Sequence, residues 1–283
     1  MHRSYFVRSA VAAVAALLAA GTACAQTPAY NFSPVNQYNL QVSAGFWNPI
    51  IRYVSQKSGV RLNLKLGRTS ADTISYVLAR EVDFAFTNHL FSPDRARMGW
   101  TVFGRGNTPP ARAQIVVPAD SPVRSLAELA GAPVAFPGPE ATLGYKMAYA
   151  QLLRRNIPVD VIFAGNTDAA FTQLFAGKAK AAGASSQLVD RYHGREGKSF
   201  RVLWSSEPYH DLALMVSPRV PADHVRAVAQ AFFGMDQDPD GRRILAAAAE
   251  LVHMETPLSF VAAGDADYAN YRAFYATAPL NVR

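Results

Sequence analysis

The feature that most constrains this chain is an alternation of short apolar segments with helix-like segments. Residues 60–64 alternate apolar and polar side chains, as a β-strand does, and residues 82–86 form a second strand-like segment. Between them, residues 72–78 place their apolar side chains on one helical face, and Thr69 or Ser70 is expected to cap that helix. Strands that alternate with helices are typical of an α/β fold with a mostly parallel sheet.

The same rhythm extends over the rest of the chain. Residues 26–37 are polar and contain prolines, which predicts a flexible leader, and we expect a first strand at 40–42 and a helix at 47–58. Further strands are predicted at 113–117, 134–136, 159–163, 179–184, 200–204 and 212–216. The pattern fits two lobes, residues 38–117 plus 212–283 and residues 118–211. A single doubly wound domain is the alternative.

The first 25 residues have the order of a secretory signal peptide. A basic start with Arg3 and Arg8 precedes an apolar stretch at 10–20, and small residues follow at Ala23 and Ala25. The apolar stretch is too short for a bilayer-spanning helix, which needs roughly 20 residues. A lipoprotein signal would place leucine where Gly21 stands, so we expect cleavage after Ala25 and export to the periplasm, with lipid anchoring at Cys24 the less favoured alternative.

Composition narrows the classes of function. Cys24 is the only cysteine, so the mature chain would have no disulfide framework, no thiol nucleophile and no cysteine metal site. The formal charge of +7 favours an anionic ligand or an acidic partner surface, although many basic surfaces have no such meaning. No run of lysine and arginine indicates nucleic-acid binding.

Enzyme signatures are missing from the sequence. It has no G-x-S-x-G elbow, no H-E-x-x-H helix, no P-loop and no G-x-G-x-x-G turn. We therefore expect no catalytic residue, no metal site and no cofactor. A secreted enzyme without a recognisable motif remains an alternative.

Polar residues gather where predicted strands lead into helices. In open α/β sheets, ligands bind beyond the carboxyl ends of the strands, where a helix N-terminus offers free N–H groups and partial positive charge. Each such residue could also act only as a helix cap. The predicted ligand-binding residues are Thr69, Ser70, Thr87, Asn88, His89, Thr142, Leu143, Gly144, Tyr145, Asn166, Thr167 and Ser185.

Two residues near the predicted helix start at Thr142 bear on anion binding in opposite ways. Gly144 in a first helical turn costs about 1 kcal/mol relative to alanine, so a ligand or another backbone is expected to approach closely there. Glu140 would repel an anion at the same helix start unless it points away or pairs with Lys146. His89 could act as a neutral donor, as a charged partner of an anion, or only as a structural histidine.

Three segments resemble one known family. They are SLAELAGAPVAF at 125–136, GPEATLGYKMAYAQLL at 138–153 and FAGNTDAAFTQLFAGKAKAAGAS at 163–185. Together they resemble the phosphonate/phosphite/phosphate-type solute-binding proteins of ABC transporters. The resemblance implies a two-lobed periplasmic binding protein of type II, with mostly parallel sheets flanked by helices and a hinge between the lobes. It also implies a monomer that delivers its ligand to a membrane permease.

The chain departs from the family pattern at the expected site. Thr142 alone keeps a hydroxyl in the helix start that is hydroxyl-rich in the family, and Thr167 stands where the family has histidine. Phe91 takes the place of an aromatic residue and brings no phenol. We therefore expect a small oxyanion or phosphonate-like ligand that is held more by backbone N–H groups than by hydroxyls. A periplasmic sensor that feeds a signalling partner is the alternative.

Overall fold

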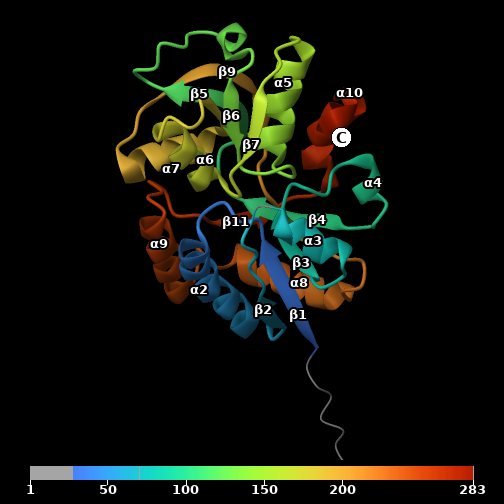
Figure 1. Cartoon of the computed structure of the whole chain (residues 1–283). Helices are drawn as coiled ribbons and strands as arrows, with labels where there is room; N and C mark the ends of the chain where they lie inside the picture. The colour runs from blue at the N-terminus through green and yellow to red at the C-terminus, as the bar shows by residue number, and fades with distance from the viewer. Residues whose placement is uncertain (1–27, 70, 283) are drawn as a thin grey trace, which may run out of the picture.

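The computed structural model describes residues 28–69 and 71–282. The predicted signal peptide at 1–25 and its Cys24 lie outside the described residues, as does Ser70. The chain forms two lobes, each built on one sheet (Figure 1). Within the described residues, no helix is both long and apolar enough to span a bilayer.

The first sheet has six strands. They are β1 (Ala29–Pro34), β2 (Arg61–Leu64), β3 (Phe84–Thr87), β4 (Thr101–Gly106), β10 (Ala213–Val216) and β11 (Phe260–Ala262). Their order is β11-β4-β10-β3-β1-β2. The pairs β1–β2 and β1–β3 are parallel, whereas β10 pairs antiparallel with both β3 and β4. β11 also pairs antiparallel with β4.

The second sheet has five strands. They are β5 (Ala111–Pro118), β6 (Pro133–Phe136), β7 (Asp160–Phe163), β8 (Ala181–Ser185) and β9 (Phe200–Tyr209), in the order β7-β6-β8-β5-β9. β6 pairs parallel with β7 and β8, and β5 pairs antiparallel with β8 and β9. Both sheets are thus mixed, because the strands that return from the other lobe, β5 and β10, run antiparallel to their neighbours. The expectation of mostly parallel sheets was wrong in this respect.

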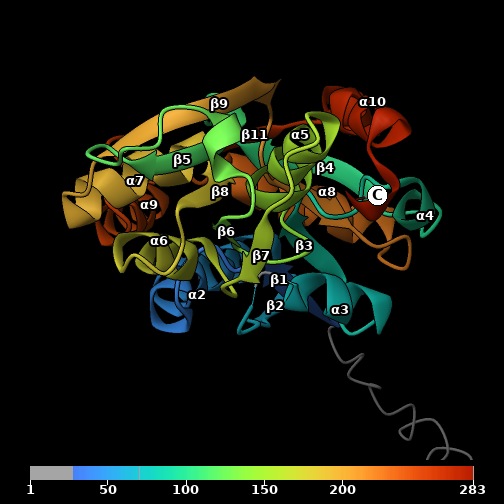
Figure 2. The same cartoon turned by 45° about the horizontal axis from the view of Figure 1, so that its top comes forward.

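Helices cover both faces of each sheet. The first lobe has α2 (Leu40–Ser58), α3 (Asp72–Leu78), α4 (Pro93–Ala96), α8 (Ala222–Phe233) and α9 (Pro239–Leu251). The second has η1 (Leu126–Leu129), η2 (Thr142–Met147), α5 (Ala148–Arg154), α6 (Thr167–Phe175) and α7 (Ser186–Glu196). Figures 1 and 2 show α6 and α7 on one side of the second sheet and α5 on the other.

The second sheet is buried on both faces because its strands are apolar at successive positions. Ile115 and Val117 pack in one cluster with η1, η2 and α5, whereas Val116 between them packs in another cluster with α6 and α7. Side chains alternate across a strand, so one apolar run fills two cores. Packing on both faces holds the sheet in place, so the carboxyl ends of β6 and β8 have fixed positions at the space between the lobes.

The C-terminal segment joins the two lobes. It contains η3 (Asp265–Tyr268), α10 (Ala269–Thr277) and η4 (Leu280–Val282). Tyr271 and Tyr275 share one buried cluster with Leu143 and Met147 of η2 and with residues of the first sheet. α10 lies beside α5 in both views (Figures 1 and 2), so this tail does not belong to the first lobe alone.

Three expectations about boundaries were wrong. Residues 29–34 of the predicted leader form β1, in the first sheet, and Phe32 there is fully buried. Residues 40–42 begin α2, because Asn39 caps the helix by accepting the Val42 N–H, and are not a strand. The second lobe begins at Ala111, since β5 pairs with β8 and β9, and not at 118. The predicted return of the chain at 212–216 is β10, in the first sheet.

Candidate functional site

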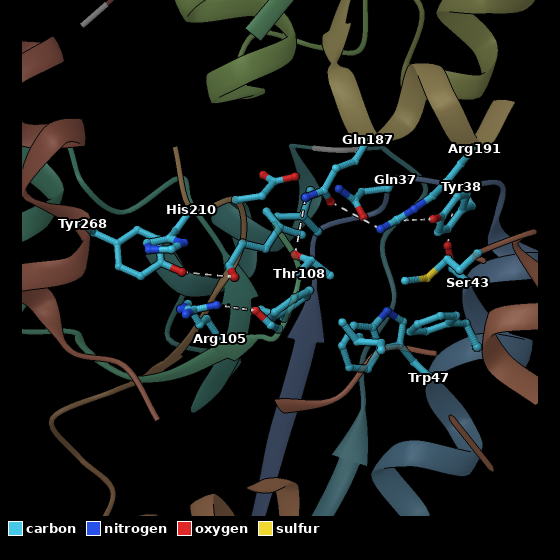
Figure 3. Close-up of a pocket in the computed structure, with 18 residues that line it drawn as sticks. Gln37, Tyr38, Ser43, Trp47, Arg105, Thr108, Gln187, Arg191, His210 and Tyr268 are labelled. Carbon is cyan, nitrogen blue, oxygen red and sulfur yellow. Dashed lines mark hydrogen bonds between the residues drawn. The ribbon is translucent and has the colours of Figure 1, made fainter. Parts of the chain in front are cut away.

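Two adjoining pockets lie between the lobes. The first, here called the η2 pocket, spans about 390 Å³ of space that is partly open to solvent. It is lined by Val35, Asn36, Gln37, Asn88, His89, Pro137, Ala141, Thr142, Leu143, Gly144, Thr167, Ser185, Leu188, Asp211 and Leu212. The second, here called the Trp47 pocket, spans about 670 Å³, also partly open to solvent (Figure 3). It is lined by Val35, Gln37, Tyr38, Ser43, Phe46, Trp47, Phe86, Arg105, Gly106, Thr108, Gln187, Arg191, His210, Asp211, Leu212, Met254, Leu258 and Tyr268.

The start of η2 forms one wall of the η2 pocket. β6 ends at Phe136, the chain turns through Pro137, and η2 begins at Thr142 as a π-helical segment that continues into α5. The Lys146 N–H donates to the Ala141 carbonyl, five residues back, at 2.9 Å. Wide turns of this kind are frequent at functional sites, and the first N–H groups of any helix lack an intrahelical acceptor. The η2 start therefore presents backbone donors to the pocket.

Gly144 explains how η2 comes so close to the sheet. A Cβ at Gly144 would lie 2.9 Å from Pro137 Cγ, and a Cβ at Gly183 of β8 would lie 2.3 Å from the Gly144 carbonyl oxygen. Two glycines thus let η2 rest directly on β8. Of the two expected causes for Gly144, the close approach of another backbone is the one seen.

The end of β3 forms the facing wall. The Thr142 hydroxyl donates to the Asn88 carbonyl at 3.1 Å and so joins the second lobe to the first. The Asn88 side-chain amide donates to Asp211 Oδ1 at 2.9 Å. Thr87 faces away from the pocket, because its hydroxyl accepts the His89 N–H at 3.0 Å and holds the turn after β3.

Glu140 does not repel an anion at the η2 start, because it is paired. Its carboxylate lies 2.5 Å from Arg95 Nη1 and 3.5 Å from Lys146 Nζ. Burial would raise the pKa of Glu140, but the hydrogen bond from Arg95 and the charges of Lys146 and Arg95 outweigh it and lower this pKa to about 2. The predicted pairing with Lys146 is present, with Arg95 as a nearer second partner.

His89 is neutral at pH 7. Burial lowers its pKa to about 3, and Arg95 and Lys146 act in the same direction against Glu140. Its Nδ1 is a buried atom without a hydrogen-bond partner among the described residues. Ser185 Oγ, at the end of β8, is also buried; it forms no hydrogen bond of standard geometry in the described chain, but it lies close enough to Asp211 to lower the pKa of that carboxyl. Buried polar atoms are nearly always satisfied in folded proteins, so His89 Nδ1 is free to meet a ligand and Ser185 Oγ is shared with Asp211.

Asp211 lies where the two pockets meet and was missed by the sequence analysis. Burial raises its pKa to about 6, against the charge of Arg191 and the hydroxyl of Ser185, which both act to lower it. It stands between β9 and β10, on a segment that crosses from one lobe to the other, and not at a strand-to-helix junction. The predicted site residues all lie at strand-to-helix junctions, so a residue on a crossover between strands was not among them. Only the two-sheet topology shows that this crossover lies in the cleft.

The Trp47 pocket was also missed. Arg105 of β4, His210 and Tyr268 lie at one end, and Arg191 of α7, Tyr38 and Trp47 lie at the other (Figure 3). These residues come from distant segments of both lobes and carry no local motif. Nothing in the sequence signals that they meet.

The predicted site residues divide into two groups. Asn88, His89, Thr142, Leu143, Gly144, Thr167 and Ser185 line the η2 pocket. Thr69, Thr87, Tyr145 and Asn166 line neither this pocket nor the Trp47 pocket, and Ser70 lies outside the described residues.

Local packing explains each displaced residue. Thr69 does not cap α3 and instead donates its hydroxyl to Asp72 Oδ1 at 2.9 Å. Tyr145 points into the core of the second lobe, where its ring lies 5.1 Å from that of Phe136. Asn166 caps α6 by accepting the Ala169 N–H at 2.9 Å, as the capping alternative predicts.

Comparison with protein families identifies the chain. A family model described as "ABC transporter, phosphonate, periplasmic substrate-binding protein" matches residues 32–268. The chain belongs to this family. Members are substrate-binding components of periplasmic uptake systems, and the two-lobed fold with its cleft is the architecture that such a role requires. In the described residues, no group of three histidine, cysteine, aspartate or glutamate side chains could hold a metal ion.

Solved structures share the fold of this phosphonate-family protein. A binding-protein component of an ABC phosphonate transporter from Pseudomonas aeruginosa aligns with a TM-score of 0.74 at 16% identity, over 87% of this chain and 85% of that one. PhnD1 from Prochlorococcus marinus, solved in complex with methylphosphonate, aligns with a TM-score of 0.73 at 14% identity, over 87% and 96%. XAC2383 from Xanthomonas citri, bound to chloride, gives 0.62 at 16% identity, over 82% and 91%. A search of curated protein sequences found no match.

Proposed function

We propose that this protein binds a small phosphonate-like solute in the η2 pocket and delivers it, as a monomer, to the membrane permease of an ABC importer. The observation that carries the proposal is the convergence of polar groups on one pocket. The η2 start offers backbone N–H groups, His89 Nδ1 is buried without a partner in the described residues, and the buried Ser185 hydroxyl lies beside Asp211. Such groups match the oxygens of a tetrahedral oxyanion.

The charge balance of the pocket supports an anion at this place. Glu140 is neutralised by Arg95 and Lys146, both of which are largely buried, so the cluster carries a net positive charge beside the η2 start. Partial burial strengthens this attraction, because the effective dielectric constant is lower than that of water. The η2 start and the end of β3 meet at the Thr142–Asn88 hydrogen bond, so an oxyanion bound beside it would contact both lobes.

Asp211 restricts the proposed solute further. A carboxylate at the edge of an anion site is unfavourable unless the ligand also carries a hydrogen-bond donor or a positive group. A phosphonate with an amino group a few bonds from phosphorus would meet both needs. Its ammonium would lower the pKa of Asp211 below about 6. Binding near pH 6 would then release protons to the solution.

The contacts between the two lobes support the proposed delivery to a permease. The Thr142–Asn88 hydrogen bond and the Arg95–Glu140 ion pair hold the two lobes together over the pocket. A solute that touches both walls would favour this arrangement by its differential affinity for it. A permease could then distinguish loaded from empty protein. Cleavage of the N-terminal signal after Ala25 would place the mature protein in the periplasm.

The test is a thermal-shift and calorimetric screen of the purified protein with phosphate, phosphite, methylphosphonate, 2-aminoethylphosphonate, sulfate and small carboxylates. A ligand at 100 times its dissociation constant should stabilise the fold by about 2.7 kcal/mol. Thr142→Asp should abolish the response, because it places a negative charge at the η2 start. Thr172→Asp, on the exposed face of α6, is the matched control and should retain it. A flat response to every phosphorus oxyanion would contradict the proposal.

Calorimetry at pH 6 tests the role of Asp211 separately. Titrations with 2-aminoethylphosphonate in buffers of different ionisation enthalpy should show more proton release for the parent protein than for Asp211→Asn. The ligand is kept constant in this comparison because a phosphoryl group itself titrates near this pH. Equal proton release by the two proteins would refute an ammonium contact at Asp211.

A further inference from the structure

We propose that the solute is larger than a simple alkylphosphonate and that an apolar body of aromatic size, attached to the phosphonate, lies in the Trp47 pocket. The inference rests on the proposed function, because it places the phosphonate head in the η2 pocket. It adds the class of substituent, which nothing in the η2 pocket by itself defines.

One side of the Trp47 pocket is apolar and tightly ordered. Trp47 of α2 lies 5.3 Å from Phe46 and 5.2 Å from Phe86, measured between ring centroids. Leu258 and the half-buried Met254 complete this wall. Rings held by neighbouring rings form a preorganised surface, on which a second ring gains contact area at little entropic cost. A polar phosphonate would gain nothing from this surface.

The apolar wall packs closely against the backbone of β4. A Cβ at Gly106 would lie 2.8 Å from Leu258 Cδ1 and 4.0 Å from the Phe86 ring. Gly106 is the last residue of β4 and directly follows Arg105. The absence of a side chain at Gly106 therefore lets Leu258 take its place in the wall.

The two pockets adjoin, and Val35, Gln37, Asp211 and Leu212 line both of them. A substituent on a phosphonate held at the η2 start would pass Gln37 and Asp211 to reach the Trp47 pocket. The donor group that Asp211 favours would lie at this junction, between head and body.

The remaining wall is polar and comes from both lobes. Arg105 belongs to the first lobe and Arg191 to the second, and neither forms a salt bridge in the described part of the chain. Arg191 donates to the Tyr38 hydroxyl at 2.9 Å, and Arg105 donates to the Gly106 carbonyl at 3.0 Å. His210 Nδ1 is buried and has no partner in the described residues. The apolar body should therefore end in a hydrogen-bond acceptor.

The experiment compares two ligands that differ by one phenyl ring. Isothermal calorimetry on the full mature chain measures methylphosphonate and benzylphosphonate. Burial of the ring against Trp47 should make benzylphosphonate bind about tenfold more tightly or better. A carboxylate in the para position of the ring should increase affinity again, and Arg105→Gln should remove that second gain.

Three variants test whether the tighter binding of benzylphosphonate depends on the Trp47 pocket. Met254→Gln keeps the size of the side chain but makes the wall polar, and it should reduce the preference for benzylphosphonate while methylphosphonate binding is kept. Met98→Gln is the matched control, since Met98 is also partly buried but lines neither pocket. Trp47→Phe keeps an aromatic core residue and should remove the change in tryptophan fluorescence that benzylphosphonate causes in the parent protein.

The outcomes separate the two proposals. If methylphosphonate binds and benzylphosphonate binds equally or more weakly, the inference is wrong and the proposed function stands. If no phosphonate binds, both fail together. A preference for benzylphosphonate that survives Met254→Gln, or a fluorescence change that survives Trp47→Phe, would also refute the inference, because the ring would lie elsewhere.

Discussion

The Arg95 guanidinium of the first lobe lies 2.5 Å from the Glu140 carboxylate of the second lobe, and both side chains are mostly shielded from solvent, at 17% and 20% exposure. The same Arg95 also donates to the His89 carbonyl at 2.8 Å. One cation therefore holds the turn after β3, neutralises the carboxylate before η2, and joins the lobes beside the η2 pocket. The charge of the proposed anion site depends on this pair.

Arg95→Gln should destabilise the protein and weaken the junction of the lobes. Loss of one partner leaves Glu140 half-buried with Lys146 alone, which should cost roughly 1–3 kcal/mol, between the values for exposed and fully buried pairs. Urea unfolding monitored by circular dichroism measures the change. Arg97→Gln removes the exposed Arg97–Asp94 pair of the same segment and should have almost no effect. Equal losses in both variants would contradict the role given to Arg95.

The Glu140 pair should also make stability depend on acid. The folded pKa of Glu140 is lowered to about 2, below its ordinary value of 4.5, so its contribution is fully present above pH 4.5. This contribution should be lost as the pH falls from about 4.5 towards 2. Glu140→Gln should therefore be less stable than the parent at pH 7, and the difference should shrink through that window. A difference that is the same at pH 7 and pH 3 would refute this assignment.

Thr142→Val should weaken ligand binding through the junction of the lobes. The isosteric change removes the hydroxyl that donates to the buried Asn88 carbonyl. A hydrogen bond of this kind contributes about 1 kcal/mol, which corresponds to roughly a fivefold increase in the dissociation constant of methylphosphonate. Thr172→Val removes a hydroxyl that donates to the Asp168 carbonyl and lines neither pocket, so it serves as the control. Unchanged affinity in Thr142→Val would show that the bond does not couple to binding.

Asp211→Asn should stabilise the empty protein at neutral pH. The folded pKa of Asp211 is about 6, above its ordinary value of 3.8, so this carboxyl lowers stability as the pH rises from about 4 to 6 and keeps it lowered at pH 7. Asparagine removes this cost, and its side-chain oxygen can still accept from Asn88. We expect a gain of roughly 1–3 kcal/mol at pH 7 that disappears below pH 4. Thermal melts of both proteins from pH 4 to pH 7 measure the difference. A lower stability of Asp211→Asn at pH 7 would contradict the prediction.

Gly183→Ala should separate η2 from β8. The new Cβ would lie 2.3 Å from the Gly144 carbonyl oxygen, a backbone atom that cannot move aside alone. Overpacking of this kind costs typically 1–3 kcal/mol, and the displaced η2 start should also lose ligand affinity. Gly194→Ala in α7 meets no atom within 4 Å and should be neutral or slightly stabilising. Chemical denaturation and calorimetry on the two variants measure both effects.

The sequence predicted the elements that local pattern defines. The strands near 60–64, 82–86 and 134–136 and the Asn166 cap all depend on residues close in the chain, and they are present as β2, β3, β6 and the start of α6. The error at β1 has a physical reason. Its polar and proline residues do not read as a strand alone, yet β2 and β3 on either side supply its hydrogen bonds and bury Phe32.

The sequence by itself determined the α/β class and the η2 wall of the cleft, because these depend on periodicity, capping and a contiguous helix start. The family and its two-lobed fold were expected from the resemblance of three contiguous segments, while the strand pattern alone left a single domain open. Only the tertiary structure decided which polar residues face the cleft. In the folded chain Tyr145 is buried, and the Thr87 hydroxyl accepts the His89 N–H within the turn after β3. Asp211, Arg105 and Arg191, which are far apart in the sequence, line one pocket. A pocket between lobes is formed by long-range packing, and local pattern carries no record of which distant side chains that packing brings together.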